Sequence, residues 1–147
     1  TWALCLLLLS SSSSLFDQVR SVKYLAKVLH LQLRPEDEVA TYRAYYQELP
    51  VYLQRRITVA DWKGELEFGS RVEDVSSWII DDATFWQRWK SPATVYMFTP
   101  RAKYDQLRAA SGQTFYLLAQ THWDVLLSNK NRGIKSPGQM RLSGLEP

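Results

Sequence analysis

Short apolar runs alternate with segments of helical periodicity between residues 37 and 127, and this order constrains the fold more than any other feature of the chain. We expect strands at 37–44, 57–60, 95–98, 115–119 and 125–127. We expect helices at 47–54 and directly after 81–82 and 99–100. Strands and helices that alternate at this spacing favour a small layered α/β domain, with a mainly parallel sheet flanked by helices.

Local signals indicate where the helices begin. Pro50 fits the first turn of its helix, where a missing N–H costs nothing. Asp81 and Asp82 can cap the next helix. In the helix after Thr99-Pro100, three residues are expected to face the core: Tyr104, Leu107 and Ala110.

Three aromatic residues, Phe85, Trp86 and Trp89, fall on one side of the helix that follows Asp82. Aromatic side chains can stack on a sugar ring, but at this spacing they more often belong to a core. We therefore expect them to be core residues.

The composition fits one globular domain, because 147 residues with 46% hydrophobic and 22% charged residues can bury a core. The single cysteine, Cys5, excludes an intrachain disulfide and a cysteine-based zinc site. The two histidines, His30 and His122, lie far apart in the sequence, which argues against a histidine-rich metal site.

The chain begins at Thr1 with a continuously apolar run, WALCLLLL at 2–9, followed by five serines at 10–14. Eight residues are too few to cross a bilayer, which takes about 20. We expect residues 1–14 to be the end of a truncated transmembrane helix and a serine-rich linker. The apolar core of a signal peptide and an ordinary buried helix end are the alternatives.

The excess of basic over acidic residues lies near the start of the chain and in the tail. Residues 35–130 hold 11 basic and 13 acidic residues, so the body of the chain is nearly neutral. A nucleic-acid-binding domain would instead spread Lys and Arg over one folded face. We therefore expect no nucleic acid partner.

Residues 20–34 have the pattern of an amphipathic helix that ends near Arg34-Pro35. Its basic face holds Arg20, Lys23, Lys27, His30 and Arg34. Its apolar stripe holds Val22, Leu25, Leu29 and Leu33. The basic face is either a solvated surface of a core-packed helix or a face near anionic lipid headgroups. The headgroup hypothesis assigns that role to Arg20, Lys23, Lys27 and Arg34.

Motifs for catalysis are weak. GELEFGSR has Gly64 and Gly69 at the spacing of a phosphate-binding loop, but Ser70 stands where the lysine belongs, and we reject it. Glu65 and Glu67 would share one face of a strand and could do acid–base chemistry or hold a metal. Two exposed glutamates are the simpler interpretation, so no catalytic, cofactor-binding or metal-binding residue is predicted.

The tract YYQELPVYLQRRITVADWKGELEFG, from Tyr45 to Gly69, resembles the C-terminal region of bacterial membrane glycosyltransferases of the protein O-mannosyltransferase superfamily, in particular the aminoarabinose transferases that modify lipid A. The residues that carry the resemblance are Tyr45, Gln47, Glu48, Leu49, Pro50, Tyr52, Leu53 and Arg55, then Glu65, Leu66, Phe68 and Gly69. Glu48 stands where the family pattern has Asp. The resemblance extends over about residues 15–130, which we take as a soluble domain; 131–147 is expected to be a disordered tail.

The resemblance implies a place and a partner for this domain. It would follow a bundle of transmembrane helices, in the bacterial inner membrane, on the periplasmic side. The full-length protein would transfer a sugar from a polyprenyl-phosphate carrier to lipid A or another acceptor. The family's catalytic acidic residues lie in a loop outside this chain, so this fragment would be accessory. It would need no cofactor, while the full-length protein would need the lipid-linked sugar donor.

The tract has two physical interpretations. Six of its side chains could face a wet groove between this domain and the membrane-embedded part: Tyr45, Gln47, Glu48, Tyr52, Arg55 and Arg56. Either arginine could then pair with a carboxylate or a lipid phosphate. Alternatively, the tract fixes the internal packing of the domain. Two other functions also remain open for the whole chain: a freestanding secreted α/β binding module, and a small soluble enzyme.

Overall fold

The computed structural model describes residues 17, 20–62 and 77–132. Within them, six strands form one sheet in the order β3-β2-β1-β4-β6-β5. The strands are β1 (Glu38–Tyr42), β2 (Thr58–Ala60), β3 (Ile79–Ile80), β4 (Val95–Pro100), β5 (Tyr116–Gln120) and β6 (Asp124–Ser128). Strands β3, β2, β1 and β4 pair in parallel, whereas β6 runs antiparallel to both β4 and β5. The predicted α/β fold with a mainly parallel sheet is confirmed.

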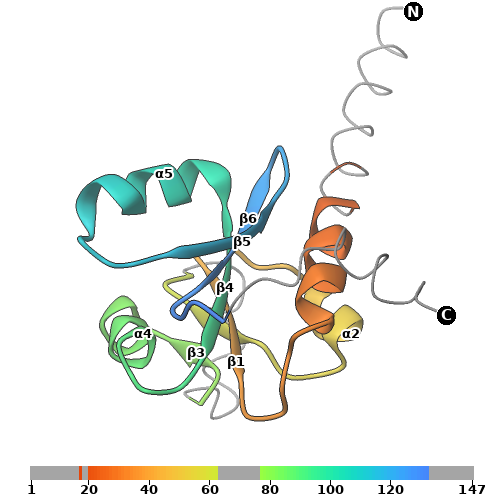
Figure 1. Cartoon of the computed structure of the whole chain (residues 1–147), viewed down its shortest axis with the longest axis horizontal. Helices are drawn as coiled ribbons and strands as arrows, with labels where there is room; N and C mark the ends of the chain where they lie inside the picture. Colours follow the sequence, from red (N-terminus) through yellow and green to blue (C-terminus); the bar gives the residue numbers. More distant parts are fainter. Residues whose placement is uncertain (1–16, 18–19, 63–76, 133–147) are drawn as a thin grey trace, which may run out of the picture.

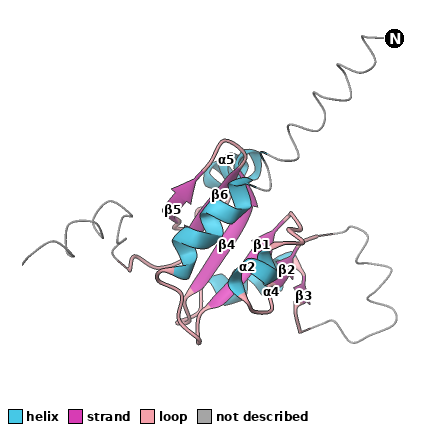
Figure 2. Cartoon of the chain, turned by 90° about the vertical axis from the view of Figure 1, so that its right-hand side faces the viewer, coloured by secondary structure: helices cyan, strands magenta, loops and turns pink. Residues whose placement is uncertain are grey.

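Helices cover both faces of the sheet (Figure 1). The helix over residues 20–30, called the N-terminal helix below, and α2 (Leu49–Leu53) lie on one side. Helices α4 (Asp82–Trp89) and α5 (Arg101–Ala110) lie on the other side. The view in Figure 2 looks onto the N-terminal helix and α2, with the strands behind them.

Each face of the sheet has its own hydrophobic core. Alternation along β1 sends Val39 to the side of the N-terminal helix and α2, and Ala40 and Tyr42 to the side of α4 and α5. The first core contains Val22, Leu25, Ala26, Leu29, Val39, Ala44, Tyr46, Leu49, Leu53, Ile57, Tyr96, Phe98 and Leu126. The second contains Ala40, Tyr42, Ala60, Ile80, Phe85, Trp89, Val95, Met97, Tyr104, Leu107, Val125 and Leu127.

The predicted helix starts agree with the structure. Pro50 stands in the first turn of α2. Asp81 caps α4, because its Oδ1 accepts the backbone N–H of Thr84 at 2.8 Å. Helix α5 begins directly after Pro100.

The expected core role of the α4 aromatics is confirmed. Phe85 and Trp89 are buried, and Trp86 is half-buried against them with a ring-centroid distance of 5.1 Å to Phe85. The Nε1–H of Trp86 donates to Asp82 Oδ1 at 2.9 Å. The rings are therefore packed together and not arranged as an open platform for a sugar.

Three details differ from the sequence-based expectations. Ala110 is exposed rather than inward, because it is the last residue of α5 and the buried side of that helix stops at Leu107. The N-terminal helix ends at His30, before Arg34, and Leu33 N–H closes the final turn on the Leu29 carbonyl at 2.9 Å. Strand β3 was not predicted, since two residues give no periodicity to detect.

The sheet has two contrasting edges. Strand β3 at one edge has only two residues. Strand β5 at the other edge has five, and its register with β6 shifts between Leu117 and Ala119. Such a shift is a β-bulge or a similar irregularity of the ladder.

Some sequence-based expectations fall outside the described residues: the apolar run at 2–9, the serine linker, Glu65 and Glu67, and the tail from residue 133. Among the described residues, no helix combines the length and apolar character needed to span a membrane.

Candidate functional site

A groove of about 520 Å³ opens on the sheet face that carries α2, and we call it the Tyr45–Trp78 groove. It is lined by Thr41, Tyr45, Tyr46, Pro50, Arg55, Arg56, Ile57, Val59 and Trp78. Strands β1 and β2 supply Thr41 and Val59, and the walls come from the segments on either side of α2 and from the residue before β3. The groove thus collects three of the six predicted interface residues: Tyr45, Arg55 and Arg56.

The groove is open because α2 is short. Five helical residues extend only about 7.5 Å, less than two strand spacings, so α2 leaves part of the sheet face uncovered. The helix stops at Gln54, which adopts a left-handed conformation with φ 50° and donates its backbone N–H to the Pro50 carbonyl. This turn places Arg55 and Arg56 between the end of α2 and the start of β2.

Arg55 is fixed by the domain itself. Its Nη1 donates to the Arg34 carbonyl at 3.2 Å, and its Nη2 donates to the Pro35 carbonyl at 2.7 Å. Arg56 is exposed. Neither guanidinium has a carboxylate partner among the described residues. Arg55 therefore also contributes to domain structure, and Arg56 is the cleaner probe of an external contact.

The adjacent tyrosines of the tract have opposite environments. Tyr45 is 37% exposed in the groove, whereas Tyr46 is 6% exposed and belongs to the core. The Tyr46 hydroxyl donates to Asp124 Oδ1 at 2.6 Å, and Ser21 Oγ donates to Asp124 Oδ2 at 2.9 Å. Burial, and secondarily the charge of Asp124, raises the pKa of Tyr46 well above its ordinary value, so the phenol remains a donor.

This buried network explains why Tyr46, within the tract, is held in the core. Ser21 lies on the N-terminal helix, Tyr46 precedes α2, and Asp124 begins β6, so one carboxylate joins three distant segments. Thr121 completes it through a hydroxyl contact with Ser21. The sequence analysis did not identify this network, because the partners of Asp124 lie 78 and 103 residues away and no local pattern links them.

A second groove of about 650 Å³ lies between the N-terminal helix and α2, and we call it the Lys23–Tyr52 groove. It is lined by Lys23, Tyr24, Ala26, Lys27, Val28, His30, Leu31, Tyr52 and Gln54. Its walls are mainly apolar, with cationic side chains among them. The exposed basic face thus also carries two exposed large apolar residues, Tyr24 and Leu31, which the sequence analysis did not assign.

The predicted site residues therefore divide among several places. Tyr52 lies with Lys23 and Lys27 in the second groove. Gln47 is exposed and Glu48 half-buried, and neither lines a groove described above. Arg20 is exposed on the N-terminal helix, and Arg34 is exposed beyond its end.

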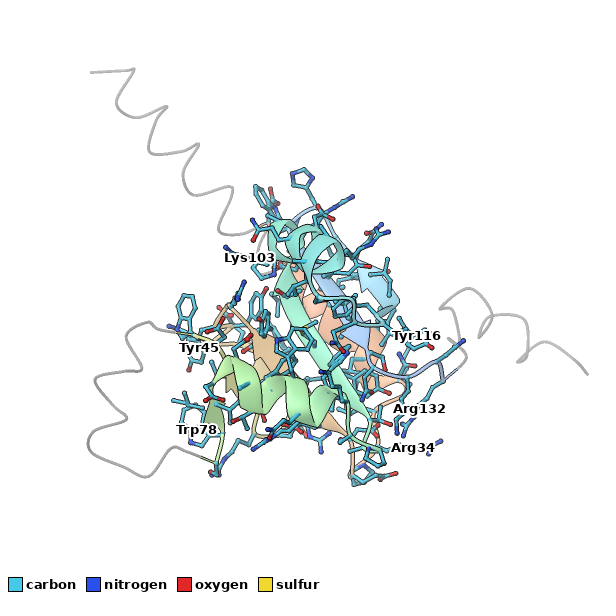
Figure 3. All side chains as sticks on the ribbon, turned by 90° about the vertical axis from the view of Figure 1, so that its left-hand side faces the viewer. Arg34, Tyr45, Trp78, Lys103, Tyr116 and Arg132 are labelled. Carbon is cyan, nitrogen blue, oxygen red and sulfur yellow. The ribbon has the colours of Figure 1, made fainter. Side chains whose placement is uncertain are left out.

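A further charged cluster lies at the start of β1, next to the backbone carbonyls of Arg34 and Pro35 that accept hydrogen bonds from Arg55. Asp37 is buried, and its Oδ2 accepts both the Arg34 backbone N–H and Arg132 Nη1 at 2.9 Å. Figure 3 shows Arg34 and Arg132 close together at this end. Arg132 stands two residues beyond the expected end of the domain at residue 130. No group of three or more His, Cys, Asp or Glu side chains in the described part of the chain could hold a metal ion.

Residues 25–129 match the family model described as the aminoarabinose transferase C-terminal domain. The chain belongs to this family. The matched range begins within the N-terminal helix and ends one residue after β6. It therefore covers all six strands, α2 and every residue that lines the Tyr45–Trp78 groove. No curated protein matches the chain.

Two solved structures of one protein share the fold of this aminoarabinose transferase C-terminal domain. They are ArnT from Cupriavidus metallidurans bound to undecaprenyl phosphate (TM-score 0.64, 22% identity, 78% of this chain) and the same protein in the apo state (TM-score 0.62, 22% identity, 74% of this chain). The present chain spans only 20% of the length of either.

Proposed function

We propose that this chain is the C-terminal, periplasmic domain of an integral glycosyltransferase of the bacterial inner membrane. The observation that carries the proposal is the family match over residues 25–129. The full-length protein would take its sugar from a polyprenyl-phosphate carrier and transfer it to lipid A or another acceptor. The solved relative is bound to undecaprenyl phosphate, a lipid of this class, which supports the choice of carrier.

Within that enzyme, the domain has an accessory role. The chemistry belongs to the membrane-embedded part of the same chain, and this domain provides contacts. The tract side chains Tyr45, Gln47, Glu48, Tyr52, Arg55 and Arg56 form the contact with that part. The arrangement of Arg56, exposed and without a carboxylate partner among the described residues, supports this role because a free guanidinium can pair across an interface.

The basic face of the N-terminal helix lies near lipid headgroups, through Arg20, Lys23, Lys27 and Arg34. All four are exposed. Tyr24 and Leu31 lie among these cations, and side chains of this kind suit the boundary between headgroups and hydrocarbon. The bilayer is thus a second partner of the domain.

Transfer assays test the enzymatic part of the proposal. The full-length protein should transfer sugar from a polyprenyl-phosphate donor, and this 147-residue chain alone should not. Arg56→Ala in the full-length protein should lower transfer, while Arg101→Ala, an exposed arginine on α5, serves as the control. Turnover by the isolated chain, or unchanged transfer by Arg56→Ala, would contradict the corresponding part of the proposal. A gene that begins immediately before Thr1 would contradict the proposal as a whole.

Vesicle binding tests the headgroup contact. Each Lys near an anionic surface contributes about 1 kcal/mol, so Lys23→Gln with Lys27→Gln should weaken binding to anionic vesicles about thirtyfold at low salt. The matched control is Lys90→Gln with Arg101→Gln, which removes two exposed charges on the opposite helix layer. Equal losses for the two double variants would show that only net charge matters and would remove the specific headgroup role.

A further inference from the structure

We propose that the Tyr45–Trp78 groove binds a phosphorylated saccharide, with the arginines at the phosphate and the two aromatic side chains at the sugar ring. The proposal rests on the proposed function only for the source of the ligand. The binding chemistry itself comes from the side chains that line the groove.

The cationic half of the groove is prepared for an anion. Arg55 is held in place by two backbone carbonyls, and no carboxylate among the described residues pairs with its charge. Arg56 adds a second, exposed guanidinium at the same wall. Planar guanidinium groups match the geometry of phosphate oxygens and bind them with charge-assisted hydrogen bonds.

The aromatic half is suited to the less polar C–H face of a sugar ring. Tyr45 is 37% exposed and Trp78 is half-buried, so both side chains keep accessible surface at the groove. Trp78 is fixed beside β2, because its carbonyl accepts the Val59 N–H at 2.6 Å. Figure 3 shows Tyr45 and Trp78 at the same edge of the molecule. Aromatic side chains with a polar tip combine an apolar stacking surface with a hydrogen-bonding group.

The size of the groove also fits a small polar ligand. A volume of about 520 Å³ lies in the range of small-molecule sites and exceeds that of one sugar phosphate.

Two classes of phosphorylated saccharide could supply this chemistry, a carrier-linked glycosyl phosphate and an acceptor that carries phosphate on another hydroxyl. The ¹⁵N-labelled 147-residue chain should therefore be titrated with glucose 1-phosphate and with glucose 6-phosphate. The readout is the indole N–H signal of Trp78, identified by its loss in Trp78→Phe. A saturable shift with either sugar phosphate supports the site, and the preferred one indicates the class.

Controls separate the two halves of the groove. Inorganic phosphate and methyl glucoside should each bind at least about tenfold more weakly than the preferred sugar phosphate, because each lacks one half of the contacts. Arg56→Gln and Tyr45→Ala should weaken binding by a similar factor, and Arg101→Gln should not. Equal binding of inorganic phosphate, or no saturable shift with either sugar phosphate, overturns the proposal. If the sugar phosphates fail while Arg56→Ala still lowers transfer by the full-length enzyme, the groove is a protein interface and only the present inference is lost.

Discussion

Tyr46→Phe is the change that tests most directly what the central tract contributes to the domain. It removes one hydroxyl from the buried network around Asp124 and leaves the aromatic ring in the first core. The ring should keep its packing, including the 6.5 Å edge-to-face contact with Phe98. The effect of the variant can therefore be attributed to the lost hydrogen bond.

The expected loss follows from the partners of the carboxylate. Asp124 is fully buried, and among the described residues the side chains that donate to its two oxygens are Tyr46 and Ser21. A hydrogen bond to a charged group contributes about 1.5–3 kcal/mol, and its removal leaves one buried oxygen with no donor in its place. Tyr46→Phe should thus lower the free energy of unfolding by about 1.5–3 kcal/mol.

The measurement is urea-induced unfolding of the chain, followed by circular dichroism. The neighbouring residue supplies the control: Tyr45→Phe removes the same atom from a partly exposed ring and should change stability by less than about 0.5 kcal/mol. If Tyr46→Phe changes the free energy of unfolding by less than about 0.5 kcal/mol, or if the two variants lose stability equally, the network around Asp124 does not hold the tract in place.

Two further predictions concern the caps and the core. Leu53→Ala should destabilise the domain by about 2–5 kcal/mol because Leu53 is 4% exposed, whereas Val51→Ala, two residues earlier on α2 at 73% exposure, should have little effect in the same urea titration. Asp81→Ala should destabilise the domain at neutral pH. Hydrogen bonds from the side chain and then the backbone of Thr84 lower the pKa of Asp81 in the folded state, so this contribution is present above the unfolded-state pKa of about 4. The difference in stability between the parent chain and Asp81→Ala, measured by thermal unfolding, should therefore shrink as the pH falls from about 4 through the folded-state pKa of Asp81. A difference that stays constant down to that pH would contradict the role of the carboxylate.

The order of strands and helices could be predicted because each element carries its own pattern. The run Val95–Phe98 reads as a buried strand in isolation, and Asp81 marks a helix start through chemistry confined to four residues. Strand β3 has no such pattern, since two isoleucines pair with β2 only when the tertiary fold brings them there. The same limit applies to Ala110, because its helical spacing from Leu107 does not reveal that the buried side of α5 stops at Leu107.

The candidate sites were predictable only in part. The tract suggested a common site for six side chains, and the structure places only three of them, Tyr45, Arg55 and Arg56, in one groove. It could not indicate Trp78 or Thr41, because the groove exists only where a short helix leaves neighbouring strands uncovered. It assigned Tyr45 and not Tyr46 to the groove, but it could not indicate why Tyr46 is buried, because the carboxylate that accepts its hydrogen bond lies 78 residues away.

The two outer strands of the sheet also affect how the domain behaves at high concentration. An unpaired strand edge is a template on which a strand of another molecule can add, and this is a common start of aggregation. Strand β3 offers only two residues to such a partner, and the irregular register of β5 interrupts the regular spacing of its outward N–H and C=O groups. The sheet of this domain is thus a poor template for edge-to-edge association. Substitutions that lengthen β3 or straighten β5 should therefore lower its solubility before they alter its fold.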